Sequence, residues 1–439
     1  MFKKSKIGQT PISSSMRVFI FIWFGQLASL IGSALTNFAL GVWVYQRSES
    51  VTLFALISLS GTLPGILISP VAGVLIDRWN RRQVMLLANL GAGLGTLAIA
   101  ILLFVGQLKI WHLYLFTASN STWSAFQLPA YAAATTLLVP KHHLSRASGL
   151  IHLGESIARL IAPILAGILI VVIKIQGVLQ LSFATFLFAL LTLLIVQFPE
   201  ARTKNTGVAE ISLKRGLTYG LIYIKERPGL LGLLIFLATV NFLAGIVEVL
   251  ATPLVLSFTS AAMLGTIMSI SGSGMLLGSL VMSTWGGAKC YINSVFRFML
   301  LGGLCILIAG LRPEVSLFTI SAFLFFFGLP IINGSIQVIF QRKVAPDIQG
   351  RLFALTNTIA GAFLPLAYIV AGPLADRVFQ PLLVSNGLLA GSLGKIVGIG
   401  PGRGIGLMFI VVGTLTMLAT VVAYQYLPLR LLEKQLPDA

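Results

Sequence analysis

Residues 51–82 read VTLFALISLSGTLPGILISPVAGVLIDRWNRR, an apolar run that ends abruptly in a group of charges. The run Val51–Ile76 contains no Asp, Glu, Lys or Arg, and a helix needs only about 20 mostly apolar residues to cross a bilayer. Three of the four charged residues in Asp77–Arg82 are basic, and basic residues gather at the cytoplasmic ends of spans. This stretch therefore predicts a transmembrane helix that ends on the cytoplasmic side.

The rest of the chain repeats this pattern. Of its 439 residues 57% are hydrophobic and 10% charged, against about 25% charged in soluble domains. These apolar runs are too long for membrane-barrel strands of ~9–11 residues, so we expect an all-α membrane protein. Hydropathy windows of about 19 residues predict twelve transmembrane helices, at residues 17–46, 51–76, 84–106, 110–138, 147–173, 178–198, 229–257, 261–285, 293–311, 315–340, 352–374 and 405–427.

The distribution of charge predicts the orientation. A net charge of +18 is typical of nucleic-acid-binding proteins, but here the basic residues lie at the ends of apolar runs and form no continuous patch. With the N-terminus inside, the inner segments hold 22 of the 30 Lys and Arg residues and the outer segments hold 7, while Arg159 alone lies within a span. We therefore expect no nucleic-acid partner, both termini in the cytoplasm, and a multi-pass protein of the cell membrane.

Four pairs of segments, in the same order along the chain, indicate an internal duplication. Residues 57–61 (ISLSG) recur as 268–272 (MSISG), 126–129 (FQLP) as 327–330 (FGLP), 37–38 (NF) as 241–242, and the series Arg146, Ala166-Gly167 as Arg351, Ala371-Gly372, at offsets of 211, 201, 204 and 205. Parallel repeats of six helices are the layout in which two bundles rock around a midplane site.

Two longer polar or glycine-rich segments interrupt the spans. The first, residues 199–228, divides the chain into six-helix bundles at 1–198 and 229–439. Within it, residues 211–227 alternate apolar and basic side chains, which predicts an amphipathic helix on the inner membrane surface; a partner-binding helix is the alternative. The second, residues 376–404, is a glycine-rich link on the outer side.

The turn after the second span resembles the signature loop of the major facilitator superfamily, G-x-L-x-D-R-x-G-R-R. Asn80 replaces the usual glycine and tolerates a left-handed backbone. The resemblance implies that the acid sits at the positive N-terminus of the helix of span 11 and gates the inner side, with the arginines as anchors; a generic basic turn is the alternative. The gating residues are Gly73, Asp77, Arg78, Arg81 and Arg82.

The fifth span carries small residues at every fourth position. Small residues at this spacing let two helix backbones approach closely, and a proline frees a backbone carbonyl. The pattern is similar to the span-5 motif of the antiporter, or drug-efflux, branch of the superfamily, although ordinary packing would also explain it. Its residues are Gly154, Ala158, Ala162, Pro163 and Gly167.

Ionisable side chains are scarce in the spans. Such residues usually face a cavity, and Glu155 precedes Arg159 by four residues, the favoured order for a helical ion pair. We expect Glu155, Arg159 and Glu248 to couple protons or contact substrate, although a structural ion pair would also account for the first two. Polar candidates for the same pathway are Gln26, Asn37, Asn120, Gln127 and Asn241, and candidate inner-loop anchors are Arg146, Asp347 and Arg351.

Some chemistry is not expected. His142, His143 and His152 could be drawn with Glu155 as a metal cluster, but two of these histidines lie in a loop among basic residues, so we predict no metal site. No Walker-type phosphate loop occurs, so ATP is not expected to drive the protein. We predict no cofactor, and a monomer.

The resemblance, which extends from the first span to the last, implies a secondary transporter. It is strongest with the branch that includes macrolide and siderophore exporters. We expect export of a small amphipathic molecule in exchange for protons, by alternating access. A proton-coupled uptake symporter or a lipid transporter of the same fold is one alternative, and a sensor or enzyme that does not transport is another.

Overall fold

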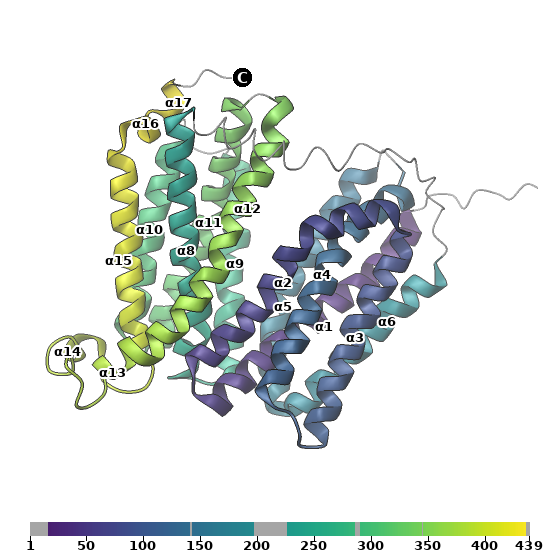
Figure 1. The fold of residues 1–439 in the computed structure, drawn as a ribbon, viewed down its shortest axis with the longest axis horizontal. Coiled ribbons are helices and arrows are strands. Elements are labelled where there is room, and N and C mark those ends of the chain that lie inside the picture. Colours follow the sequence, from purple (N-terminus) through teal and green to yellow (C-terminus); the bar gives the residue numbers. More distant parts are fainter. Residues whose placement is uncertain (1–15, 141–142, 197–225, 286–289, 345, 436–439) are drawn as a thin grey trace, which may run out of the picture.

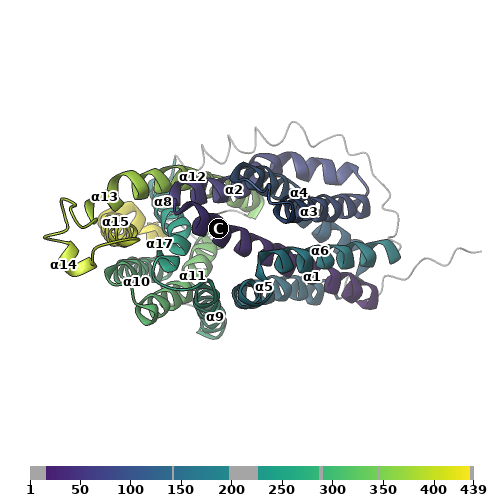
Figure 2. The same ribbon diagram turned by 90° about the horizontal axis from the view of Figure 1, so that it is seen from below.

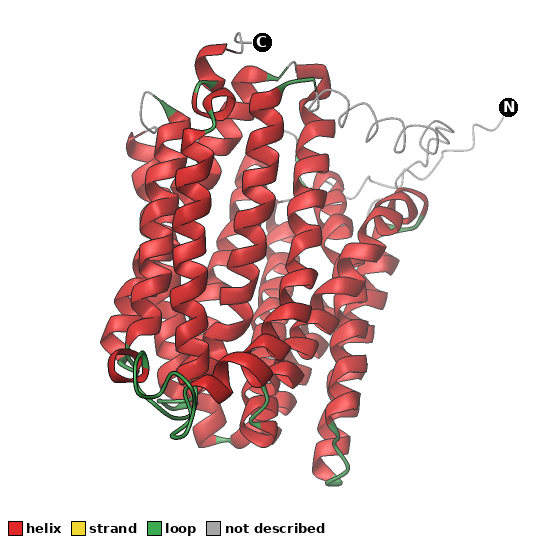
Figure 3. Ribbon diagram, turned by 60° about the vertical axis from the view of Figure 1, so that its left-hand side comes forward, coloured by secondary structure: helices red, strands yellow, loops and turns green. Residues whose placement is uncertain are grey.

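A computed structural model describes residues 16–140, 143–196, 226–285, 290–344 and 346–435. Within these ranges the chain is helical and contains no strand, as Figure 3 shows. Twelve helices are more than 20 residues long: α1 (Met16–Ser48), α2 (Val51–Arg78), α3 (Arg81–Phe104), α4 (Ile110–Leu138), α5 (Leu144–Val172), α6 (Lys174–Ile195), α8 (Pro228–Leu256), α9 (Ala261–Trp285), α10 (Tyr291–Leu311), α11 (Val315–Lys343), α12 (Pro346–Pro373) and α15 (Arg403–Gln425).

These helices confirm the predicted all-α membrane fold. The predictions for 110–138 and 261–285 coincide with α4 and α9 at both ends. In the described part of the chain eleven helices are long and apolar enough to cross a membrane, and α4 is the exception among the long helices. It is 29 residues long, but polar residues such as Asn120 and Gln127 lower its hydropathy. Residues 211–225 of the amphipathic helix predicted at 211–227 lie outside the described residues.

Side-chain caps fix two of the helix starts. The Ser50 hydroxyl accepts a hydrogen bond from the Leu53 amide at the start of α2. The Asn80 side chain accepts one from the Arg82 amide at the start of α3, and its backbone is extended, with φ −66° and ψ 114°. Asn80 therefore does not adopt the left-handed backbone that Asn tolerates. Asn suits this position because it is among the best N-capping residues.

The helices form two bundles that lie side by side, α1–α6 in one and α8–α15 in the other (Figure 1, Figure 2). Short segments fill the outer link after α12: a π-helix, η2 (Leu374–Phe379), followed by α13 (Gln380–Leu382) and α14 (Gly394–Val397). After α15 the chain ends in α16 (Leu427–Arg430) and α17 (Leu432–Gln435). We call the side of the C-terminus the inner side, following the charge distribution.

The two bundles meet along α2 and α12 and along α5 and α9. Each interface has a glycine near its outer end. A Cβ on Gly167 would lie 2.9 Å from the Ala261 carbonyl oxygen, and a Cβ on Gly372 would lie 2.6 Å from Thr52 Cα. Both distances are too short for a side chain, so the backbones touch only because these residues are glycines.

An apolar core crosses the boundary between the bundles at the same level. Val51, Phe54 and Ala55 of the first bundle are buried together with Ala371 and Ala375 of the second. Toward the inner side the bundles separate (Figure 1). The structure is therefore closed on the outer side and open on the inner side.

Arg81 and Arg82, in the first turn of α3, bind within their own bundle. Arg81 donates from Nη1 to the Ala133 carbonyl of α4 at 3.3 Å. Arg82 donates from Nε and Nη2 to the Leu193 and Leu194 carbonyls at the end of α6, at 3.0 and 2.8 Å. The last carbonyls of a helix have no partner within the helix, so Arg82 caps α6 with a charge that its dipole favours.

Replacing Arg82 should destabilise the first bundle. Arg82→Ala removes two charge-assisted hydrogen bonds, so we expect the free energy of unfolding to fall by ~1–3 kcal/mol. Arg82→Lys should recover only part of this loss, because an ammonium group lacks the planar fork of guanidinium. Thermal unfolding of the purified protein in detergent measures both changes. Arg312→Ala, at an exposed position before α11, is the control, and an equal loss there would contradict the assignment.

Candidate functional site

A cavity of about 850 Å³ lies between the bundles. One of its walls is α5 of the first bundle, and the others come from α8, α9, α10, α11 and α15 of the second. It extends from Val255 and Phe318, near the outer ends of α8 and α11, to Ser279 and Ile336 in the inner half. At its inner end the cavity is bordered by His152, whose side chain is 78% exposed, so the cavity opens toward the inner side.

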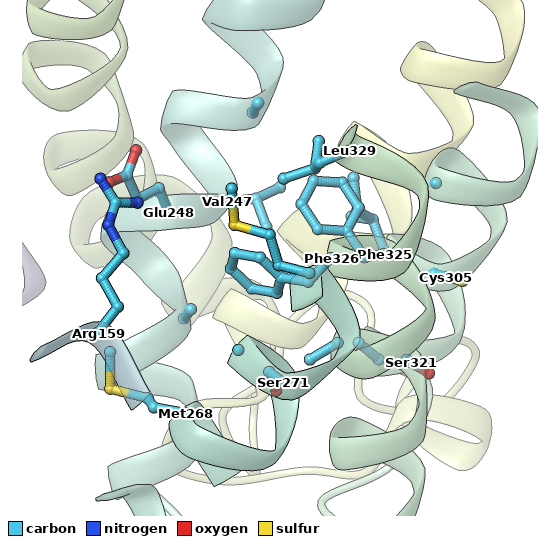
Figure 4. A pocket seen from close by; sticks show the side chains of 18 of the residues that line it. Arg159, Val247, Glu248, Met268, Ser271, Cys305, Ser321, Phe325, Phe326 and Leu329 are labelled. Atoms are coloured by element: carbon cyan, nitrogen blue, oxygen red, sulfur yellow. The ribbon is translucent and has the colours of Figure 1, made fainter. Parts of the chain in front are cut away.

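Arg159 and Glu248 face each other in this cavity. Arg159 comes from α5 and Glu248 from α8, so each bundle contributes one charge. Both side chains are exposed to the cavity, and that of Arg159 extends toward Glu248 (Figure 4). The two charges attract each other. The structure thus brings together two predicted residues that are 89 positions apart in the sequence.

Two further residues connect this pair to the bundle interface. The Tyr368 hydroxyl of α12 lies close to the Glu248 carboxyl group and to the Thr62 side chain of α2. The polar group of Arg159, Glu248, Tyr368 and Thr62 therefore contains two side chains from each bundle. Any movement of one bundle against the other changes its distances.

Glu155 has a different partner from the one expected. Its Oε2 lies 3.5 Å from His152 Nδ1, whereas no ion pair joins Glu155 to Arg159 in the part of the chain that the structure describes. The His152 side chain is 78% exposed, which places this pair at the inner mouth of the cavity. Arg159 turns instead toward Glu248, the opposite charge across the cavity.

Beyond the charged pair the cavity wall is apolar and aromatic (Figure 4). Methionines are flexible and polarizable, and so adapt to ligands of different shape, while aromatic rings offer flat apolar surface. A few hydroxyl and amide groups interrupt this surface. The side chains include Met268, Met275, Phe298, Phe325, Phe326, Leu329, Ser271, Ser321, Asn241 and Asn333.

The predicted polar residues of the first bundle have other surroundings. Gln127 Nε2 donates to Gln26 Oε1 at 2.8 Å, and Ser29 donates to Asn89 Oδ1 at 3.0 Å. Gln26 is only 3% exposed. This network links α1, α3 and α4 within the bundle. Asn37 and Asn120 are not among the residues that line the large cavity either, whereas Asn241 is.

The small residues of α5 pack against helices on two sides. Ala158 and Ala162 are buried, and Gly154 lies against the indole of Trp23 in α1. Toward the outer end, a Cβ on Gly265 of α9 would collide with the Pro163 carbonyl oxygen. The motif thus provides close packing on α1 and on α9.

The inner-side motifs are described only in part. Gly73, Asp77 and Arg78 fall in the last turns of α2, and Asp347 and Arg351 in the first turns of α12. The surroundings of Gly73 and the side chains of the other four residues lie outside the described part of the structure. Arg146 is exposed in the first turn of α5.

Tyr368, Asn89 and Asp376 are not among the residues that the sequence predicts for a site. Tyr368 and Asn89 each lie within an apolar span. A phenol or amide in such a span indicates a hydrogen-bond partner nearby, because buried polar groups need partners. Asp376 follows α12 on the outer side, where an acid in a loop is ordinarily solvated.

Comparison with known proteins agrees with this architecture. The Major Facilitator Superfamily model matches residues 22–367. Macrolide efflux protein A of Streptococcus pyogenes is 27% identical over 372 residues, which cover 82% of this chain and 90% of that protein. The enterobactin exporter of Salmonella typhi is 26% identical over 293 residues, which cover 64% of this chain and 68% of that protein.

Solved structures show the same fold. A bacterial homologue of the human lysosomal transporter Spinster, in an inward-facing and unoccupied conformation, superposes with a TM-score of 0.71 at 14% identity, covering 97% of this chain and 99% of that one. A mutant of the nucleoside transporter NupG gives a TM-score of 0.72 at 13% identity, over 93% and 100% of the two chains. The chain is therefore a multi-pass membrane protein of the major facilitator superfamily, a secondary transporter and not an enzyme.

Proposed function

We propose that the protein exports a small amphipathic molecule from the cell in exchange for protons. The observation that carries this proposal is the cavity, in which apolar and aromatic walls lie beside two opposite charges from different bundles, Arg159 and Glu248. Such a cavity suits a largely apolar ligand with a few polar groups. The names of the relatives, a macrolide efflux protein, a multidrug efflux pump and an enterobactin exporter, support export of this class of molecule.

Glu248 is the proposed proton carrier. In the inner-open state it is wetted by the cavity and can exchange a proton with the cytoplasm. When ionised it attracts Arg159 of the other bundle, and when protonated it loses this attraction. Binding or loss of one proton therefore changes the attraction between the bundles, which is how proton movement can drive alternating access.

The loop after α2 is the proposed inner gate. Asp77 would bind at the N-terminus of α12 when the inner side closes, with Gly73 and Arg78 shaping the turn. Arg81 and Arg82, which already bind α4 and α6, would hold the loop rigidly on its bundle. Arg146, Asp347 and Arg351 would anchor the starts of α5 and α12.

The direction of transport separates export from uptake. We expect inside-out membrane vesicles that contain the protein to accumulate a macrolide when their interior is made acidic, because the inner mouth of the cavity then faces the medium. Right-side-out vesicles should not accumulate it. Accumulation of a nutrient or lipid analogue in right-side-out vesicles would instead establish the symporter alternative. A cell panel of growth inhibitors, with and without the protein, identifies the cargo.

Removing the charge of Glu248 should uncouple transport from protons. For Glu248→Gln we expect the pH-driven rate to fall by about tenfold or more, the effect of losing a charge interaction of ~1.4 kcal/mol. Exchange of labelled cargo without a proton gradient should persist. Glu155→Gln makes the same chemical change at the mouth of the cavity and should retain most of the rate. Equal losses in the two variants would refute the special role of Glu248.

The aromatic wall should determine cargo affinity. Phe326 lines the cavity and is 36% exposed. Phe326→Ala removes apolar surface that a bound ligand would cover, so we expect the Kd of a transported drug to rise by about tenfold. Leu324 lies on the same helix, is 37% exposed and does not line the cavity, so Leu324→Ala is the matched control. Tryptophan fluorescence titration measures both, and an unchanged Kd in Phe326→Ala would exclude this wall from the site.

A further inference from the structure

One carboxylate joins the two bundles at their outer ends. Asp376, in η2 just after α12, accepts hydrogen bonds from the Thr52 amide at 2.9 Å and the Val51 amide at 3.1 Å. It also accepts from the Thr52 hydroxyl at 2.7 Å and the Ser50 hydroxyl at 2.8 Å. All four donors belong to the start of α2, more than 320 residues earlier in the chain.

The position of Asp376 follows from the contact one turn before it. Gly372 lies directly against Thr52 and Ala55 of α2. Four residues later, Asp376 therefore reaches the first turn of the same helix. The helical turn that holds it is a π-helix, η2, a rare form that is frequently found at functional sites.

The contact is electrostatically favourable. The first amides of a helix have no partner within the helix, and the helix dipole attracts a negative charge at this end. Asp376 is half-buried, so water competes only in part for its oxygens. Hydrogen bonds to an ionised carboxylate are among the strongest in proteins.

The related interface between α5 and α9 lacks this contact. Gly167 lies against Ala262 in the same way as Gly372 lies against Thr52. The two glycines are 205 positions apart, which is one of the offsets of the internal duplication. The same offset relates Asp376 to Val171, an apolar residue that is 67% exposed. Both interfaces thus share the close glycine contact, but among the described residues a carboxylate bridges only the α2–α12 pair.

We propose that Asp376 is the gating residue of the outer side. It holds the start of α2 against α12 while the cavity is open to the inside, and these four hydrogen bonds must break before the outer side can open. The proposal concerns the balance between the inner-open and outer-open states. It holds whatever the cargo or coupling ion, so its test is independent of the proposed function.

The test measures distances between the bundles in the full-length protein in lipid nanodiscs, without cargo. Cys290→Ser and Cys305→Ala remove the native thiols. Spin labels at Lys109→Cys and Arg312→Cys report the separation of the outer ends, since both positions are exposed in outer turns. Labels at Gln83→Cys and Thr284→Cys, in a second sample, report the inner ends.

Removing the carboxylate should shift the population. With Asp376→Ala we expect the outer distance to lengthen, the inner distance to shorten, and the ratio of outer-open to inner-open molecules to rise about tenfold. Glu314→Gln is the control, because Glu314 is an outer carboxylate that accepts a hydrogen bond from the nearby Ser316 hydroxyl of its own bundle. It should leave both distances unchanged.

A second variant tests the same contact from the other bundle. Ser50→Ala combined with Thr52→Val removes two hydroxyl donors and leaves Asp376 in place, so the shift should have the same direction and a smaller size. If Asp376→Ala does not fold, this double variant still tests whether the hydrogen bonds to Asp376 hold the outer side closed. Distance distributions equal to those of the unmodified protein in the variants that fold would refute the proposal.

Discussion

The distance between the bundles at their outer ends is the constraint on which the rest of this structure depends. Gly167 and Gly372 bring the backbones of α5 and α12 against α9 and α2, at separations that no side chain would permit. Lipid chains are as apolar as leucine, so helices in a bilayer associate mainly through such close packing. With the outer ends held together, the inner ends separate, and the cavity with its inner mouth follows from this geometry.

The same geometry decides which of the few polar groups near the interface lie close together. Arg159 and Glu248 can attract each other only because α5 and α8 stand on opposite sides of one cavity. Tyr368 and Thr62 extend the contact from Glu248 across α12 to α2. A charge within a membrane protein is energetically unfavourable unless an opposite charge or water lies near it. Here the opposite charge belongs to the other bundle. The interaction energy of the two charges therefore depends on the relative position of the bundles.

Polar residues in the first and second bundles serve different purposes. In the first, Gln26 and Gln127 bind each other, and Ser29 binds Asn89, inside the bundle, which stabilises one rigid unit. In the second, Asn241 and Asn333 face the cavity. The sequence does not distinguish these two groups of residues, because an amide in an apolar run indicates only that some hydrogen-bond partner lies nearby. Which side of the helix it occupies depends on how the helix packs.

The sequence by itself determined the helices, their order and the family. Apolar runs of sufficient length must become helices in a bilayer, because every backbone group needs an internal partner. The ends of α4 and α9 were therefore predictable to the residue. Only the tertiary structure decided the partners: Arg159 with Glu248 rather than Glu155, Arg82 with the end of α6, and Asp376 with the start of α2. These residues lie from 89 to more than 320 positions apart in the sequence, and only the packing of the helices brings them near one another.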